Sequence, residues 1–296
     1  MNSNFLVIKN LIYSGANALA GVTYGFPSIG AILGFIEKLN LEIGKCTQRP
    51  FSLSSVVILS HDTNCRVYRE SSNSDFSFVQ KRAPLAKDGK TAPIIQEGYI
   101  DGDVSLVIAL EDIQIFYEED FNYIKDEILS ILMRLKFAGG CIDSISDLML
   151  VSNDNLKTTI KNLYPFAALV NRSDYFTDMV HQNSDIKILD CFLSLSSIHH
   201  RFNKTLNIWQ QLYSKDGFLV PLHVGYKQIS EDFENSDSVN LRSSDAKACF
   251  VEPIFSAGEW LCSYQKLLDL LERDYEKASW KYFHTGSYFL FSSSIL

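Results

Sequence analysis

Apolar residues recur along this chain with two spacings, and each spacing predicts a different element. Runs rich in β-branched and aromatic residues predict strands in the first half of the chain, at residues 5–13, 53–60, 94–100 and 104–110. The last two runs flank Asp101-Gly102, a dipeptide that suits a tight hairpin turn. Between the first two runs, a helix is predicted to start at Pro27, because proline is tolerated at the first helical position.

A helical spacing is clearest over residues 121–136. The apolar residues of this segment fall on one stripe, made of Phe121, Ile124, Ile128, Ile131, Leu132 and Leu135. Acidic residues precede the helix, and Arg134 and Lys136 close it, which matches the helix dipole. Gly139-Gly140 is expected to end it.

The second half of the chain is predicted to be mostly helical at 153–213 and then to alternate. Strands are predicted at 218–226, 248–255 and 280–291, a polar loop at 231–244, and a helix at 264–277. The order strand, helix, strand, hairpin, helix in the first half indicates an α+β fold with a modified ferredoxin-like (RRM-type) core. We expect residues 1–296 to form a single domain, with an inserted basic arm at about 62–93 and a helical insertion at about 150–215.

The charge balance and the cysteines restrict the class of protein. The chain of 296 residues has 27 basic against 35 acidic side chains, which argues against a stand-alone DNA binder with a basic surface. A small RNA held at a local basic site is not excluded by this balance. The cysteines form no CxxC pair, which indicates free thiols in a reducing cytosol and no zinc site. Since no signal-peptide pattern or run of ~18 apolar residues is present, we expect a cytoplasmic protein without membrane contact, metal or cofactor.

Motifs that carry catalytic or metal chemistry are incomplete in this sequence. Gly89-Lys90-Thr91 lacks the first glycine of a phosphate-binding loop, since that position holds Pro84. His199-His200 are adjacent and therefore expected on a helix surface, where they point too far apart to share one metal. Glu252 and Glu259 lie seven residues apart around a proline and a glycine, and we expect structural roles for them.

One electrostatic feature rises above this background. Basic residues gather within ten positions of the predicted arm, offset only by Asp88: Lys81, Arg82, Lys87 and Lys90. The group is either a solvated loop or a contact for phosphates. Aromatic residues that could stack on unpaired bases, or equally pack in the core, are Tyr24, Phe26, Phe76, Phe78 and Trp260.

The order of distinctive blocks along the chain resembles the Csy family, whose member holds the 5′ handle of the crRNA in the type I-F CRISPR surveillance complex (Cascade). The blocks are ANA at 16–18, YGFPSIGAILGF at 24–35, VVILSH at 56–61, KRAPLAKDGKTAPIIQEG at 81–98, VSLVIAL at 104–110, LMRLKFAGG at 132–140, YPFAALVNR at 164–172, GFLVPLHVGY at 217–226, NLR at 240–242 and CFVEPIFSAGEWL at 249–261. Together they cover most of the chain. The combination of blocks is specific for this family, whereas any one block alone would be weak evidence for it.

The resemblance implies an RRM-like fold without catalysis of its own. It implies that the chain and the large Csy subunit together clasp the crRNA 5′ handle, next to an adjacent backbone subunit of the complex. Target DNA within the complex is a further candidate partner. In this interpretation the handle phosphates are neutralised by Lys81, Arg82, Lys87 and Lys90, the splayed bases are shaped or read by Asn17, Tyr24 and Phe26, and the RNA-binding set is completed by Arg242.

Other functions remain open at the level of sequence. A guide-RNA-processing endoribonuclease would need a general base such as His61 near a tyrosine or lysine. A purely protein-binding wedge would dock the arm on an acidic surface of a partner subunit.

Overall fold

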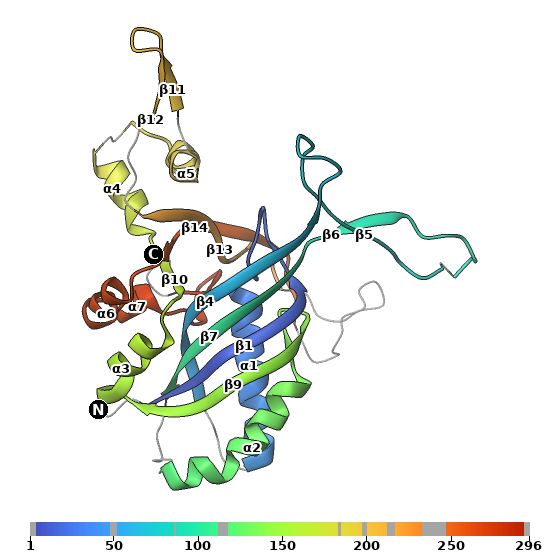
Figure 1. The fold of residues 1–296 in the computed structure, drawn as a ribbon, viewed down its shortest axis with the longest axis vertical. Coiled ribbons are helices and arrows are strands. Elements are labelled where there is room, and N and C mark those ends of the chain that lie inside the picture. Colours follow the sequence, from blue (N-terminus) through green and yellow to red (C-terminus); the bar gives the residue numbers. More distant parts are fainter. Residues whose placement is uncertain are drawn as a thin grey trace.

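The computed structural model describes residues 4–47, 52–85, 87–111, 118–182, 185–196, 200–211, 217–232 and 247–292. These residues form a mixed α+β structure in which helices cover both faces of one large antiparallel sheet (Figure 1). None of the described helices is long and apolar enough to cross a membrane.

The centre of the sheet is built from the first half of the chain. Its strands are β1 (Asn4–Asn17), β4 (Ser52–Tyr68), β7 (Tyr99–Glu111) and β9 (Gly140–Ser152). They lie in the order β4-β7-β1-β9 and pair antiparallel throughout. Helix α1 (Ile29–Thr47) connects β1 to β4, and α2 (Glu118–Arg134) lies between β7 and β9 in the chain. Both helices lie against the same face of the sheet (Figure 1).

Continuous apolar runs in the strands are explained by burial on both faces. In β1, Leu6 and Ile8 point into a core shared with α1 and α2, whereas Phe5 and Val7 point to the opposite face. That second core is closed by α3 (Asn153–Leu163), α6 (Tyr264–Arg273) and α7 (Tyr275–Ala278). Because side chains alternate between the faces of a strand, a strand covered on both sides reads as one apolar run.

The predicted hairpin turn at Asp101-Gly102 is wrong, because these residues lie inside the single strand β7. Gly102 pairs with Tyr13 of β1 on one side and with Thr63 of β4 on the other. A Cβ on Gly102 would lie 2.6 Å from the Tyr13 hydroxyl oxygen, so glycine serves close packing there. The dipeptide therefore marks a close approach of neighbouring strands and not a turn.

The second half of the chain extends the sheet beyond β4. The added strands are β10 (Ala167–Asn171), β14 (Val251–Leu261), β13 (Phe218–Gln228), β16 (Tyr288–Leu290) and β15 (Phe283–Thr285), in that spatial order. At the other edge, β8 (Lys136–Phe137) pairs with the start of β9. The predicted strands at 218–226 and 248–255 correspond to β13 and β14. The predicted closing strand is split around Gly286 into the short hairpin β15–β16.

The predicted helical middle is only partly helical. It contains α3, α4 (Asp174–Gln182) and α5 (Ile188–Ser196), but also the strand β10 in the main sheet. Residues 200–211 form a separate hairpin of β11 (His200–Asn203) and β12 (Ile208–Gln211). His200 thus lies on a strand and not on a helix, while His199 lies outside the described residues. The short apolar run at 167–170 becomes a strand because neighbours on both sides supply its hydrogen bonds.

Between β4 and β7 the chain leaves the central sheet, but later than the predicted start of the arm at about residue 62. Residues 62–66 still pair with β7 and belong to the central sheet. Beyond them, β5 (Ser77–Arg82) and β6 (Ile94–Glu97) form a hairpin that projects from the body, which we call the arm hairpin (Figure 1).

Candidate nucleic-acid interface

The arm hairpin holds its basic residues on exposed strands. Lys81 and Arg82 lie opposite Ile95 and Ile94 in the register of β5 and β6. The ammonium of Lys81 donates to the Tyr99 hydroxyl at 3.1 Å and pairs with Glu97 at 3.3 Å. Arg82 is exposed. Lys81 is therefore held in place near the base of the hairpin.

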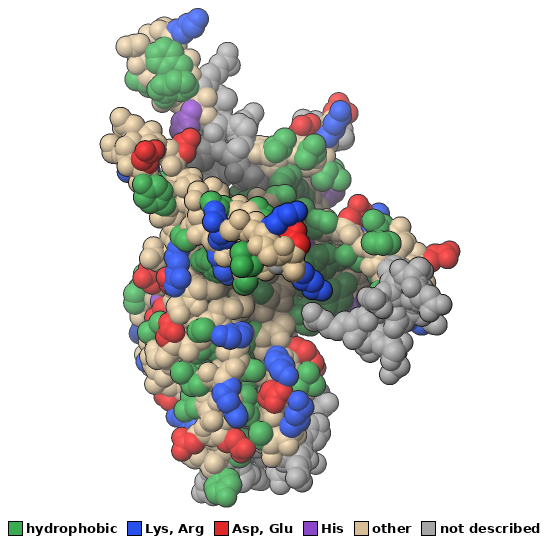
Figure 2. All heavy atoms as spheres, turned by 90° about the vertical axis from the view of Figure 1, so that its right-hand side faces the viewer, with side chains coloured by type: hydrophobic (Ala, Val, Ile, Leu, Met, Phe, Trp, Pro, Cys, Tyr) green, Lys and Arg blue, Asp and Glu red, His purple; other side chains and the backbone are tan. Residues whose placement is uncertain are grey.

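The connecting loop of the arm hairpin carries the other basic residues. Lys87 and Lys90 are both exposed, and Lys90 pairs with Asp88 at 3.2 Å. Figure 2 views the molecule from the side on which the arm hairpin projects and shows blue and green side chains gathered around it. The residues 77–97 include four basic and two acidic side chains, so this projection is positive although the chain carries a formal charge of −8. A positive projection of this kind can contact phosphates.

Two further arginines lie at the base of the arm and are already engaged. The Arg66 guanidinium donates to both carboxylate oxygens of Asp101, at 2.7 and 2.8 Å. This guanidinium, with a further hydrogen bond from the Gly15 amide, holds the pKa of the Asp101 carboxyl below its usual value. Arg69 lies over the ring of Phe76 at 4.9 Å. Arg66 therefore stabilises the junction between the arm and the sheet.

Tyr24 lies beside the arm hairpin. It ends a small hairpin of β2 (Leu19–Ala20) and β3 (Thr23–Tyr24). The Tyr24 ring meets the Phe78 ring of β5 edge to face, with centroids 5.3 Å apart. Leu19 packs against Gly98, where a Cβ would lie 3.1 Å from Leu19 Cγ. Since Tyr24 is 65% exposed, most of its ring remains accessible.

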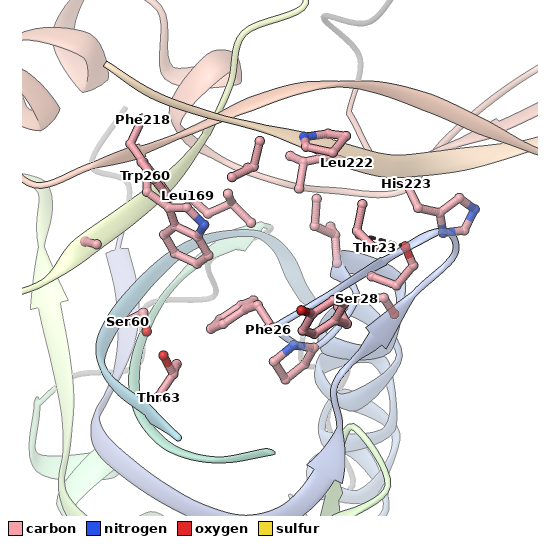
Figure 3. A pocket seen from close by; sticks show the side chains of 18 of the residues that line it. Thr23, Phe26, Ser28, Ser60, Thr63, Leu169, Phe218, Leu222, His223 and Trp260 are labelled. Carbon is pink, nitrogen blue, oxygen red and sulfur yellow. Dashed lines mark hydrogen bonds between the residues drawn. The ribbon is translucent and has the colours of Figure 1, made fainter. Parts of the chain in front are cut away.

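Phe26 is placed differently, against the core. Its ring meets that of Trp260 edge to face at 4.8 Å, beside a cavity of about 710 Å³ (Figure 3). Ser60 and Thr63 from β4 and Leu222 from β13 also line this cavity. Phe26 thus forms part of the wall that lies between the central sheet and its extension.

Asn17 forms hydrogen bonds that hold the neighbouring backbone in place. Its side-chain oxygen accepts from the Leu19 backbone N–H at 2.9 Å, and its backbone N–H donates to the Ala138 carbonyl oxygen at 2.9 Å. Asn17 also lies opposite Tyr99, the residue that holds Lys81. It therefore sets the start of the β2–β3 hairpin next to the arm, and its exposed position leaves it accessible.

Parts of the sequence blocks that carry the family resemblance meet in two pairs. The block at 16–18 lies against the block at 138–140, where a Cβ on Gly140 would lie 2.5 Å from the Ser14 carbonyl oxygen. The block at 25–28 meets the block at 258–260 through the Phe26–Trp260 contact. Ser28 caps the start of α1, since its hydroxyl accepts from the Ala31 backbone amide at 3.2 Å.

Both ring nitrogens of His61 lie within hydrogen-bond distance of other residues. Nδ1 lies 2.8 Å from the Pro165 carbonyl oxygen, and Nε2 lies 2.7 Å from the Ser105 hydroxyl. A general base needs a free ring nitrogen within reach of its substrate. The described contacts of His61 therefore favour a structural role over a catalytic one.

The glutamates of β14 have unlike environments. Glu259 is buried and forms an ion pair with Arg172, which also contacts Asp174. Glu252 is exposed and pairs with Lys227 at 3.8 Å. The two carboxylates have separate ion-pair partners, and neither pairing points to a shared catalytic site. Among the described residues, no group of three or more histidine, cysteine, aspartate or glutamate side chains could hold a metal ion.

The structure brings some of the predicted site residues together and leaves others apart. Lys81, Arg82, Lys87 and Lys90 share the arm hairpin, and Tyr24 lies beside it. Phe26 and Asn17 lie further toward the body, and Arg242 lies outside the described residues. The exposed Ile94 and Ile95 of β6 were missed, although two adjacent apolar residues in a polar arm are a readable signal.

Comparison with known proteins gives the class of this chain. Residues 6–286 match the family model described as CRISPR-associated protein (Cas_Csy2). The chain therefore belongs to the Csy2 family of CRISPR-associated proteins, and the resemblance drawn from the sequence blocks is confirmed. A relative, CRISPR-associated protein Csy2 of Pseudomonas aeruginosa (strain UCBPP-PA14), is 27% identical over 297 residues, which span 90% of each chain.

Proposed function

We propose that this chain is a non-catalytic RNA-binding subunit of a type I-F CRISPR surveillance complex. It clasps the crRNA 5′ handle together with the large Csy subunit and helps to assemble that end of the complex. Family membership supports the assignment to CRISPR defence. The observation that carries the RNA contact is the arm hairpin, a positive projection on a net acidic chain.

The arm hairpin contributes two kinds of contact in this proposal. Arg82, Lys87 and Lys90 are exposed and reach the phosphates of a strand laid along the hairpin. Lys81 is oriented by Tyr99 and exchanges part of its contact with Glu97 for a phosphate. Tyr24 at the base offers an exposed ring on which an unpaired base stacks. Asn17 and Phe26 act indirectly, by fixing the position of the hairpin and loop that carry Tyr24.

The fold supports this interpretation at the level of topology. The order β4-β7-β1-β9, with one helix after the first strand in the chain and one before the last, is consistent with a ferredoxin-like (RRM-type) core, and the proposal includes such a core. We extend the proposal to a single domain in which the arm hairpin and the segment around 150–215 are insertions. Arg242 completes the RNA-binding set in this account.

The complex supplies the remaining partners in this proposal. Besides the crRNA and the large Csy subunit, the chain contacts an adjacent backbone subunit, and target DNA passes near it within the complex. We place this assembly in the cytoplasm. The exposed apolar side chains of the arm hairpin, Leu85, Ile94 and Ile95, favour burial against another subunit.

Those apolar side chains also support a second candidate, an arm that only wedges between protein subunits. The two functions differ in what the basic residues do. In the wedge, Lys81→Ala with Arg82→Ala weakens binding of a partner subunit and leaves RNA affinity unchanged. In the clasp, the same pair of substitutions weakens RNA binding.

Co-expression with the large Csy subunit, with and without a type I-F guide RNA, tests the proposal. We expect a stable pair in size-exclusion chromatography that shifts guide RNA through its 5′ handle. Incubation of this pair with repeat RNA should give no cleavage, and His61→Ala should leave the RNA pattern unchanged. A chain that stays monomeric and ignores both partners contradicts the proposal, and cleavage abolished by His61→Ala establishes the nuclease instead.

A further inference from the structure

A second hairpin projects from the molecule, at a different place from the arm hairpin. Strands β11 and β12 pair from His200↔Gln211 to Asn203↔Ile208 and form a sheet separate from the large one. In Figure 1 this β11–β12 hairpin lies beyond α4 and α5 at one end of the long axis of the molecule. An isolated two-stranded hairpin is at best marginally stable in water. A function that uses its surface accounts for such a projection better than a contribution to the core.

The β11–β12 hairpin presents an aromatic pair to solvent. Phe202 and Trp209 are cross-strand partners, with ring centroids 5.4 Å apart. Trp209 is 69% exposed and Phe202 is 40% exposed. Trp280, by contrast, is fully buried. Tryptophan is usually buried to a large extent in folded proteins, so an indole exposed at the end of a projection points to a ligand that covers it.

The charge of the segment indicates what that ligand is. Residues 200–211 contain one arginine, one lysine and one histidine, no aspartate or glutamate, and four amide side chains. The rest of the chain is acidic enough to give a net charge of −8. Cationic and amide residues in the same short segment as an exposed indole match the phosphates and the base faces of an unpaired strand. A partner protein needs no such bias against acidic residues.

We infer that the β11–β12 hairpin is a second contact for single-stranded nucleic acid, in which an unpaired base stacks on Trp209 and Lys204 neutralises a neighbouring phosphate. Lys204 is exposed in the loop between the strands. The site is separate from the arm hairpin and goes beyond the proposed clasp of the 5′ handle. Single-stranded RNA and single-stranded DNA share this chemistry.

Tryptophan fluorescence of the full chain reports on this site directly. Trp280 is buried and Trp260 packs against Phe26, so quenching by a bound base arises mainly at Trp209. The probes are twelve-nucleotide strands of one mixed sequence without handle sequence, as RNA, as DNA and as duplex DNA. We expect quenching by a single strand, none by the duplex, and loss of the signal in Trp209→Phe. Stronger quenching by RNA identifies the guide as the source, and stronger quenching by DNA identifies an unwound target.

Affinities of variants separate stacking from a general effect on the hairpin. Trp209→Ala should weaken binding of the single strand about 5- to 150-fold, the range expected for loss of one stacked base. Trp209→Phe should retain most of the affinity. Ile208→Ala, which shortens the preceding side chain of the same strand, should change it less than twofold. Lys204→Ala should weaken binding and make it less dependent on salt.

Two results would overturn the inference. One is equal affinity of the wild type and Trp209→Ala for both single strands. The other is loss of a protein partner in Trp209→Ala with nucleic-acid binding intact. Trp209→Ala is measured alone and together with Lys81→Ala and Arg82→Ala. The loss of binding at the β11–β12 hairpin can then be told from a loss at the arm hairpin, because the two sets of substitutions affect separate sites.

Discussion

The ring of Tyr24 meets the ring of Phe78 edge to face, with centroids 5.3 Å apart. This contact joins the β2–β3 hairpin, next to the start of α1, to the first strand of the arm hairpin. A second contact, between Leu19 and Gly98, joins the same two hairpins. The arm hairpin is therefore seated on the body by side chains, in addition to its connection through β4 and β7.

Replacing Phe78 should loosen the arm hairpin without unfolding the body. Phe78→Ala removes the edge-to-face contact, which is worth about 1 kcal/mol, or roughly a fivefold change in local opening. Hydrogen exchange of amides in 77–97 should quicken by about that factor while the melting temperature changes little. Phe76→Ala is the control, because Phe76 is 63% exposed and contacts Arg69 in place of Tyr24. Equal exchange in wild type and Phe78→Ala would show that this contact does not seat the arm.

The glutamates of β14 offer a matched pair for stability. Glu259→Gln removes the buried carboxylate that pairs with Arg172 and leaves this guanidinium, among the described residues, only its ion pair with Asp174, and we expect a loss of about 3 kcal/mol in the free energy of unfolding. Glu252→Gln removes an exposed partner of Lys227 and should change that energy by about 0.5 kcal/mol or less. Denaturant unfolding of both variants measures the difference. Similar midpoints would mean that the Arg172–Glu259 pair does not hold β10 to β14.

His223 should make stability depend on pH. Burial lowers the pKa of its imidazole, and its Nε2 is buried without a hydrogen-bond partner among the described residues. The unfolded chain then binds a proton that the folded chain rejects, starting near the ordinary pKa of about 6.5. Stability should therefore be full above that pH and fall as the pH drops toward the lowered folded pKa.

Denaturant midpoints at several pH values between about 5 and 7.5 test this, in the range where histidine titrates. His223→Gln should flatten the dependence, and His284→Gln, which changes an exposed histidine, should preserve it. An unchanged slope in His223→Gln would assign the pH dependence to other groups.

The sequence was most informative where burial alone decides structure. The apolar runs at 5–13 and 53–60 could be recognised as strands because both faces of the sheet are covered. Asp101-Gly102 misled, since a glycine required by the Tyr13 hydroxyl looks the same in sequence as a turn glycine. Local signals cannot separate these cases, because the packing partner is 89 residues away in the chain.

The candidate site, like the fold, could be predicted from the sequence only in part. The basic run at 81–90 is local and could be recognised in the sequence, but the pairing of β5 with β6 that carries it was not predicted. The Tyr24–Phe78 and Phe26–Trp260 contacts join residues far apart in the chain, so their geometry could not be predicted. The exposure of Trp209 was equally hidden, because the same residue at the end of a helix would be expected in the core.

The salt dependence of guide-RNA binding tests the central claim most directly. Each phosphate contact on a single strand contributes about 0.7 to the slope of log affinity against log salt. Lys81→Ala with Arg82→Ala should weaken binding of a guide RNA with its 5′ handle to the pair with the large Csy subunit, and should reduce the slope by about 1.4. Lys38→Ala with Lys45→Ala removes the same charge from α1, where both lysines pair with Glu42, and should leave the slope unchanged. An equal slope in wild type and in the arm variant would contradict the account.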